Sequence, residues 1–172
     1  MLTERMEAAL NKQCNEEFFA SYLYLAMVAY FEALNLEGFA HWMRMQAQEE
    51  LGHAMKFFDY VNERNGRPVL YAIKEPPVEW DSPLAAFEAA LGHEQRVTGL
   101  INELVDIANA ESDHAAKVFL NWFLEEQVEE EASADAIVQK LRLVGDSGAG
   151  LFMLDREMAQ RQPEAEEGGG AE

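Results

Sequence analysis

The sequence is poor in cysteine and in basic residues, and both shortages exclude classes of function. Cys14 is the one cysteine, so the chain forms neither an intrachain disulfide nor a thiolate pair for a metal or redox site. A reducing, cytoplasmic setting is therefore expected. The 13 lysines and arginines stand against 32 aspartates and glutamates, for a net charge of −19. Such a surface attracts cations and repels DNA, RNA and anionic lipid, so no nucleic-acid binding is expected.

Long apolar runs are also missing. The longest uncharged apolar stretch is residues 18–31, with 14 residues, whereas a helix needs about 20 to cross a bilayer. The first residues are acidic where a secretion signal would be basic and then apolar. We therefore expect neither a membrane span nor export.

Proline and glycine are confined to a few places, which divide the chain into long helical segments. No strand-like alternation is long enough to matter, and Ser82-Pro83 is typical of a helix start. We expect one di-metal domain over residues 1–161 and a mobile acidic, glycine-rich tail over residues 162–172. The expected helices are residues 4–34, 38–65, 83–111, 114–144 and a short apolar piece at 151–158.

The lengths of the connections predict the topology. The first and third joins have only a few residues, so each joined pair is an antiparallel hairpin. Residues 66–82 form a longer connection that reaches about 56 Å when extended, while a helix of about 28 residues is about 42 Å long. The predicted fold is all-α: a four-helix bundle with one long crossover and a short fifth, C-terminal helix.

Carboxylates interrupt the inward-facing stripe of every long helix. Steps of three and four residues define these stripes, which are otherwise mostly apolar; the first runs from Leu10 to Leu34. Each stripe is polar near the midpoint of its helix, and midpoints coincide whichever way a helix points. The polar residues are Glu17, Glu50 with His53, Glu94, and Gln127 with Glu130.

Four carboxylates and one imidazole are therefore expected to converge inside the bundle. Buried like charges without a counter-charge cost many kcal/mol, so a positive group must lie among them. Two divalent cations neutralise four carboxylates. An oxygen-rich ligand set with a single imidazole suits iron or manganese better than structural zinc.

These residues resemble the ferritin family, and specifically the non-haem ferritins of bacteria and archaea. Bundles with one long crossover and inward-facing carboxylates are themselves the standard description of that fold. The similarity extends from the first residues to about Arg161. The motifs that carry it are Asn15-Glu16-Glu17, Gln48-Glu49-Glu50-Leu51-Gly52-His53, His93-Glu94 and Glu126-Gln127-x-Glu129-Glu130-Glu131.

The resemblance implies a ferroxidase: a homo-oligomeric shell of 24 subunits that oxidises Fe(II) with O2 or H2O2 and stores it as a ferric mineral. It implies that Glu17, Glu50 and His53 bind a first iron. Glu50 bridges to a second iron held by Glu94 and Glu130, with Gln127 beside it as a weak ligand or a hydrogen-bonding group.

The resemblance also implies a third, inner iron site made by Glu49, Glu126 and Glu129 with Glu130; the alternative is a solvated acidic face. Tyr24 matches a family tyrosine that holds a carboxylate and supplies an electron, although a plain core tyrosine would look the same in sequence.

Departures from related families are also informative. Leu51 follows the bridging glutamate where haem-binding bacterioferritins have methionine, so no haem is expected. Gln127-x-x-Glu130 lacks the second histidine of many di-iron proteins, so the second iron should bind more loosely. The fifth helix is too short to be stable alone, and we expect it at an interface after a flexible Gly148-Ala149-Gly150 entry.

Two other functions stay open at this point. A non-storing di-iron oxidase or oxygenase would need a substrate pocket beside the metals. A structural or interaction bundle would use the Glu/His network only to fix helix register. The residues flanking the site favour tight packing over a pocket: Ala20, Tyr24, Met43, Phe57, Leu91 and Phe123.

Overall fold

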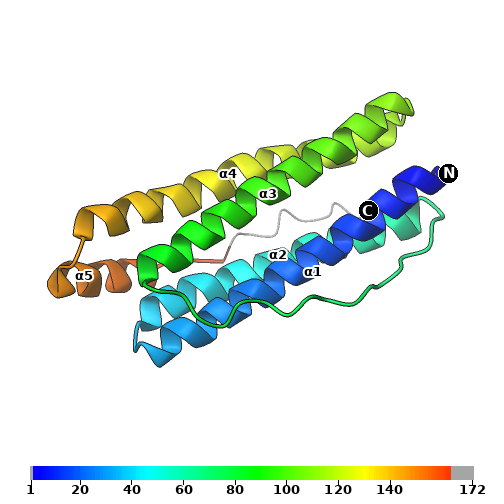
Figure 1. Cartoon of the computed structure of the whole chain (residues 1–172). Helices are drawn as coiled ribbons and strands as arrows, with labels where there is room; N and C mark the ends of the chain where they lie inside the picture. Colours follow the sequence, from blue (N-terminus) through cyan, green and yellow to red (C-terminus); the bar gives the residue numbers. More distant parts are fainter. Residues whose placement is uncertain (1, 164–172) are drawn as a thin grey trace.

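The computed structural model describes residues 2–163, which form five helices and no strand. In Figure 1 the long helices lie side by side, and the short last helix lies at one end of the bundle. The helices are α1 (Glu4–Ala33), α2 (Glu37–Glu63), α3 (Pro83–Ala110), α4 (His114–Val144) and α5 (Gly148–Met158).

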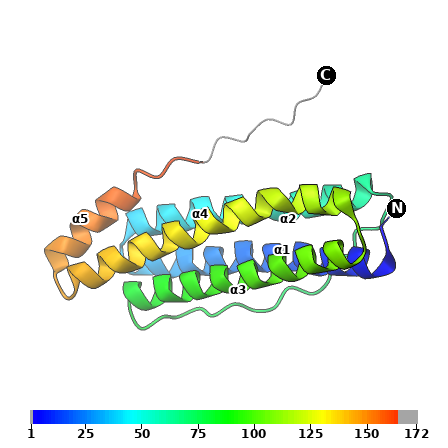
Figure 2. The same ribbon diagram turned by 90° about the horizontal axis from the view of Figure 1, so that it is seen from above.

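The topology is the predicted one. α1 and α2 form an antiparallel hairpin, as do α3 and α4, and residues 64–82 run the length of the bundle so that α2 and α3 are parallel (Figures 1 and 2). The all-α bundle with one long crossover is thereby confirmed. Most of the predicted tail, residues 164–172, lies outside the described residues.

Polar caps begin three of the long helices. The side chains of Thr3, Ser82 and Asp113 accept hydrogen bonds from backbone N–H groups three residues ahead, at 3.1, 3.0 and 3.0 Å. These bonds satisfy donors that a helix start leaves without partners. The Ser82-Pro83 start is confirmed, and the predicted ends of the long helices agree with the structure within two residues.

The start of α5 differs from the prediction. Gly148, Ala149 and Gly150 form its first turn and are not a separate flexible entry, because the Ser147 hydroxyl accepts a hydrogen bond from Gly150 N at 3.1 Å. α5 packs against the start of α2, where a Cβ on Gly38 would lie 1.7 Å from the Asp155 carbonyl oxygen. Only glycine allows this approach.

Two apolar clusters fill the bundle on either side of its middle. The α5-side cluster includes Met27, Phe31, Phe39, Phe87 and Ile137, and the far cluster includes Leu10, Phe57, Ile101, Leu120 and Phe123. Almost all residues of the predicted stripes are buried or partly buried.

Leu34 was wrongly included in the first stripe. It is 44% exposed because α1 ends at Ala33 and Leu34 is its C-cap residue.

Within residues 2–163, no helix is both long enough and apolar enough to cross a membrane.

Candidate metal centre

The interval between the two apolar clusters is polar, and it holds the carboxylates that the stripes predicted. Glu17 comes from α1, Glu50 and His53 from α2, Glu94 from α3 and Glu130 from α4. All five are buried, with at most 6% of their surface exposed. The midpoint argument is confirmed: four helices each bring a carboxylate to one level.

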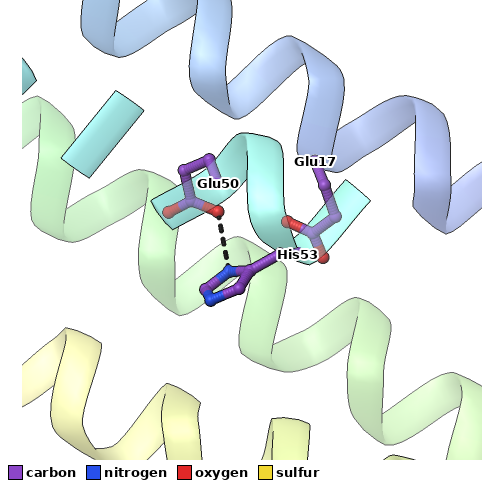
Figure 3. A group of neighbouring side chains, drawn as sticks. All are labelled: Glu17, Glu50 and His53. Carbon is purple, nitrogen blue, oxygen red and sulfur yellow. Dashed lines mark hydrogen bonds and ion pairs between the residues drawn. The ribbon is translucent and has the colours of Figure 1, made fainter. Parts of the chain in front are cut away.

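Glu17, Glu50 and His53 form the first group of potential ligands. One ligand atom from each lies within 4.8 Å of the others, and Figure 3 shows the three side chains directed into the same space. His53 Nδ1 lies 3.1 Å from Glu50 Oε2. Gln13 Nε2 donates to Glu17 Oε1 at 2.7 Å, whereas the buried Glu17 Oε2 has no hydrogen-bond partner among the described residues. That oxygen is suited to bind a cation.

Glu50 also belongs to a second group, with Glu94 and Glu130. One carboxylate oxygen from each again lies within 4.8 Å of the others. Carboxylate oxygens from one residue can bind two ions, so Glu50 has the position that a bridging ligand needs. Glu50 is therefore shared by two groups of potential metal ligands.

Tyr24 and Gln127 both donate hydrogen bonds to Glu94. The Tyr24 hydroxyl, fully buried, donates to Glu94 Oε1. Gln127 Nε2 lies 3.4 Å from Glu94 Oε2 and donates to the Glu94 carbonyl oxygen at 3.2 Å. Of the two roles considered for Gln127, the geometry favours the hydrogen-bonding one.

The four residues of the predicted third site are not brought together as a set. Glu126 is buried and forms a third group with His53 and Glu130, its Oε1 lying 3.9 Å from His53 Nε2. Glu49 instead pairs with Arg161, Oε2 to Nη2, at 2.5 Å. Glu129 is exposed and belongs to none of the three groups within residues 2–163.

Burial dominates the electrostatics of the centre. Desolvation and the Glu50 charge raise the pKa of Glu17 to about 8, and the same causes raise the pKa of Glu94 to about 8. Desolvation raises the pKa of Glu50 to about 7 and that of Glu130 well above its usual range, with Glu50 as the second cause. A divalent cation among these carboxylates would favour their charged forms and so oppose this rise.

The prediction from sequence assigned no role to two residues that contact the centre, Gln46 and Arg161. Gln46 is buried on the α2 stripe, and its Nε2 donates to Glu130 Oε2 at 2.6 Å and to Glu50 Oε1 at 3.1 Å. Its position on the inward-facing stripe of α2 could have identified it from the sequence. Arg161 lies beyond every helix, and no local periodicity links it to α2.

Four packed helices with an oxygen-rich group of potential metal ligands at mid-length are typical of one class, the four-helix-bundle carboxylate proteins that bind pairs of transition-metal ions. Comparison with known proteins narrows this class. A family model described as "Ferritin-like domain" matches residues 7–144. The chain belongs to the ferritin family.

Individual relatives agree with this assignment. The chain is 45% identical over 161 residues to a "Bacterial non-heme ferritin" of Bacteroides fragilis, covering 94% of this chain and all of the relative. It is 42% identical to a protein of the same description from Staphylococcus saprophyticus, covering 94% and 96% of the two chains. A solved "novel open pore ferritin" from Archaeoglobus fulgidus superimposes with a TM-score of 0.93 at 56% identity, covering 94% of this chain and 99% of that one.

Proposed function

We propose that this chain is an iron-storage ferritin with ferroxidase activity. Its substrates are Fe(II) and an oxidant, O2 or H2O2. Two Fe(II) ions bind in the middle of the bundle, are oxidised there, and pass inward to a ferric mineral enclosed by many copies of the chain.

The observation that carries this proposal is the sharing of Glu50 between two groups of potential ligands. Glu17 and His53 complete one group, and Glu94 and Glu130 complete the other. A shared carboxylate keeps two ions close enough to give up electrons to one oxidant molecule. Four carboxylates against two Fe(II) ions make the loaded centre neutral.

The redox step balances without any further cofactor. Two Fe(II) ions lose one electron each, and O2 takes up both electrons and two protons to become H2O2. With H2O2 as the oxidant, the same two electrons and two protons give two molecules of water. Oxidation raises the charge of the ion pair from +4 to +6, which exceeds the −4 of four carboxylates, so hydroxide from water is needed to neutralise the product iron.

The protein residues hold the ions and handle the protons. Each carboxyl of the centre that carries a proton releases it when Fe(II) binds, because the cation favours the charged form. The Tyr24 hydroxyl donates a hydrogen bond to Glu94 Oε1 and thereby fixes the orientation of this carboxylate. The lack of a histidine in the second group favours looser binding there.

We further propose a homo-oligomeric shell of 24 copies, with α5 at an interface between copies. Packing between copies would cover apolar residues of α5 that are exposed in the single chain, Phe152 (62%) and Met153 (72%). The cytoplasm is the proposed compartment, and the buried, unpaired Cys14 thiol is compatible with it. No haem takes part in this proposal.

Aerobic iron loading of the purified protein tests the proposal. A storage shell of 24 copies of a 19.4 kDa chain has a mass of about 466 kDa. It should take up on the order of a thousand or more iron atoms per particle, whereas a simple di-iron enzyme would retain about two per chain. A monomer or dimer that turns over iron without retaining it would overturn the storage function.

The two other functions receive less support. An oxygenase needs an organic substrate beside the metals, yet five of the six flanking residues are at most 2% exposed and the sixth, Leu91, is partly buried; the five are Ala20, Tyr24, Met43, Phe57 and Phe123. A purely structural network would not need the buried Glu17 Oε2, which no described hydrogen-bond donor reaches.

A further inference from the structure

The chain turns back after α5 and passes over α2. This strap, residues 159–163, leaves α5 at the end of the bundle (Figure 2). One contact of α5 and one of the strap hold this segment on α2 independently of any charge at the metal centre. Asp155 Oδ1 accepts a hydrogen bond from Phe39 N at 3.0 Å, and His41 Nε2 lies 2.9 Å from the Arg161 carbonyl oxygen.

The strap brings one guanidinium group to the edge of the metal centre. Arg161 Nη2 donates to Glu49 Oε2 at 2.5 Å, and only 16% of the Arg161 side chain and 13% of the Glu49 side chain are exposed. The guanidinium carbon lies 4.2 Å from the centre of the Trp42 ring. A charged, stacked and largely desolvated pair of this kind is held in one geometry.

Arg161 also determines how the Gln46 amide is turned. Arg161 Nη1 donates to Gln46 Oε1 at 2.8 Å, and an arginine can only donate hydrogen bonds. Because the oxygen of Gln46 faces Arg161, its NH2 group faces the centre, where it donates to Glu130 and Glu50. A chain of hydrogen bonds therefore runs from the strap to two predicted iron ligands.

We propose that Arg161 is a resident counter-cation of the metal centre, which occupies Glu49 in place of a third metal ion and positions Gln46. The proposal rests on the iron-binding function proposed above and adds a limit to it. A third ion that uses Glu49 must first displace a guanidinium that is always charged. Two cations that compete for one carboxylate weaken each other's binding. A third ion therefore binds Glu49 only when Arg161 moves away from it.

Anaerobic calorimetric titration of the metal-free protein with Fe(II) tests this proposal, because oxidation plays no part in it. The wild type should bind two ions per chain tightly and a third weakly. Arg161→Gln removes the charge while keeping a hydrogen-bond donor, and it should tighten the third event about tenfold or more. Arg161→Lys restores the charge and should return the third event to wild-type strength.

Two further variants isolate the cause. Arg156→Gln removes an exposed arginine of α5 and should titrate like the wild type. The double variant Arg161→Gln with Glu49→Gln should lose the tightened third event, because the freed carboxylate is gone. An equal third affinity in wild type and Arg161→Gln overturns the proposal. The absence of the first two events in wild type would instead overturn the iron-binding function.

A crystallographic measurement covers the case in which Arg161→Gln does not assemble. Wild-type crystals soaked anaerobically in rising Fe(II) should show the Arg161 side chain leaving Glu49 as a third ion appears. A third ion bound to Glu49 beside an unmoved Arg161 contradicts the proposal.

Discussion

The two halves of the metal centre are built differently, although one glutamate serves both. The first half, on α1 and α2, has an imidazole and the Glu17 oxygen that lacks a hydrogen bond. In the second half, on α3 and α4, hydrogen bonds from Tyr24 and Gln127 occupy Glu94, and a bond from Gln46 occupies Glu130.

This difference suggests a division of labour. A site with a nitrogen ligand and one carboxylate oxygen that accepts no hydrogen bond should bind Fe(II) more tightly, because the ion gains a ligand atom that no donor already uses. The second half adds no nitrogen ligand of its own, so its binding should be weaker. A storage protein needs both properties, since iron has to be captured and then released to a mineral.

Removing the shared residue should have the largest effect. Glu50→Ala takes a ligand from both halves, so we expect the loss of both tight Fe(II) ions and a fall of about a hundredfold or more in the initial oxidation rate. Stopped-flow absorbance in the near ultraviolet measures the rate. The exposed Glu125 on α4 offers the matched control, Glu125→Ala, which should oxidise iron normally. Unchanged kinetics in Glu50→Ala would refute the site.

Substitutions confined to one half sharpen the comparison. His53→Ala should abolish rapid oxidation, because the tight first position is lost. Glu130→Ala should slow oxidation by about tenfold to a hundredfold while leaving one tight ion per chain. Anaerobic Fe(II) titration counts the ions. If Glu130→Ala loses both ions, the two halves do not bind independently.

The raised carboxyl pKa values predict how the metal-free protein responds to pH. Native Glu17, Glu50 and Glu94, with pKa values of about 8, 7 and 8, keep protons that the unfolded chain releases above about pH 4.5. Stability should therefore fall as pH rises from about 4.5 to 8, lowering Tm by roughly 10 °C. Calorimetric melting measures this slope.

A variant that lacks one of these carboxyl groups separates their effect on stability from that of the many other acidic residues of the chain. Glu50→Gln cannot titrate and should flatten the slope, while a divalent cation should restore stability at pH 8 and release protons as it binds. A metal-free Tm that rises from pH 5 to 8 would contradict the assignment of these groups.

Tyr24→Phe should produce the smallest change. It removes one hydroxyl and its hydrogen bond to Glu94, which corresponds to about 1–2 kcal/mol or about fivefold to thirtyfold weaker binding of the second ion. The first ion should be unaffected. Competition with a chromophoric chelator measures both affinities, and an equal weakening of both would show that Tyr24 does not act on one half alone.

The positions of the buried ligands could be predicted because they follow helix geometry. A spacing of three or four residues puts Glu50 and His53 on one face, and the lengths of the connections place the middles of the four helices at one level. Leu34 failed the same rule only because the helix ended one residue earlier than the pattern.

Contacts between segments that are far apart in the sequence could not be predicted from helix geometry. Arg161 meets Glu49 across 112 residues, and the contact depends on how α5 packs against Gly38 at the start of α2. No sequence period links these positions. The pairing of Glu49 and the exposure of Glu129 therefore emerged only from the folded chain.

The most direct test of two neighbouring ions is anomalous diffraction at the iron edge, measured on crystals soaked anaerobically in Fe(II). The account predicts two iron peaks on either side of the Glu50 carboxylate, one next to His53 and the other next to Glu94. Iron found only on exposed carboxylates, with no peak beside Glu50, would contradict it.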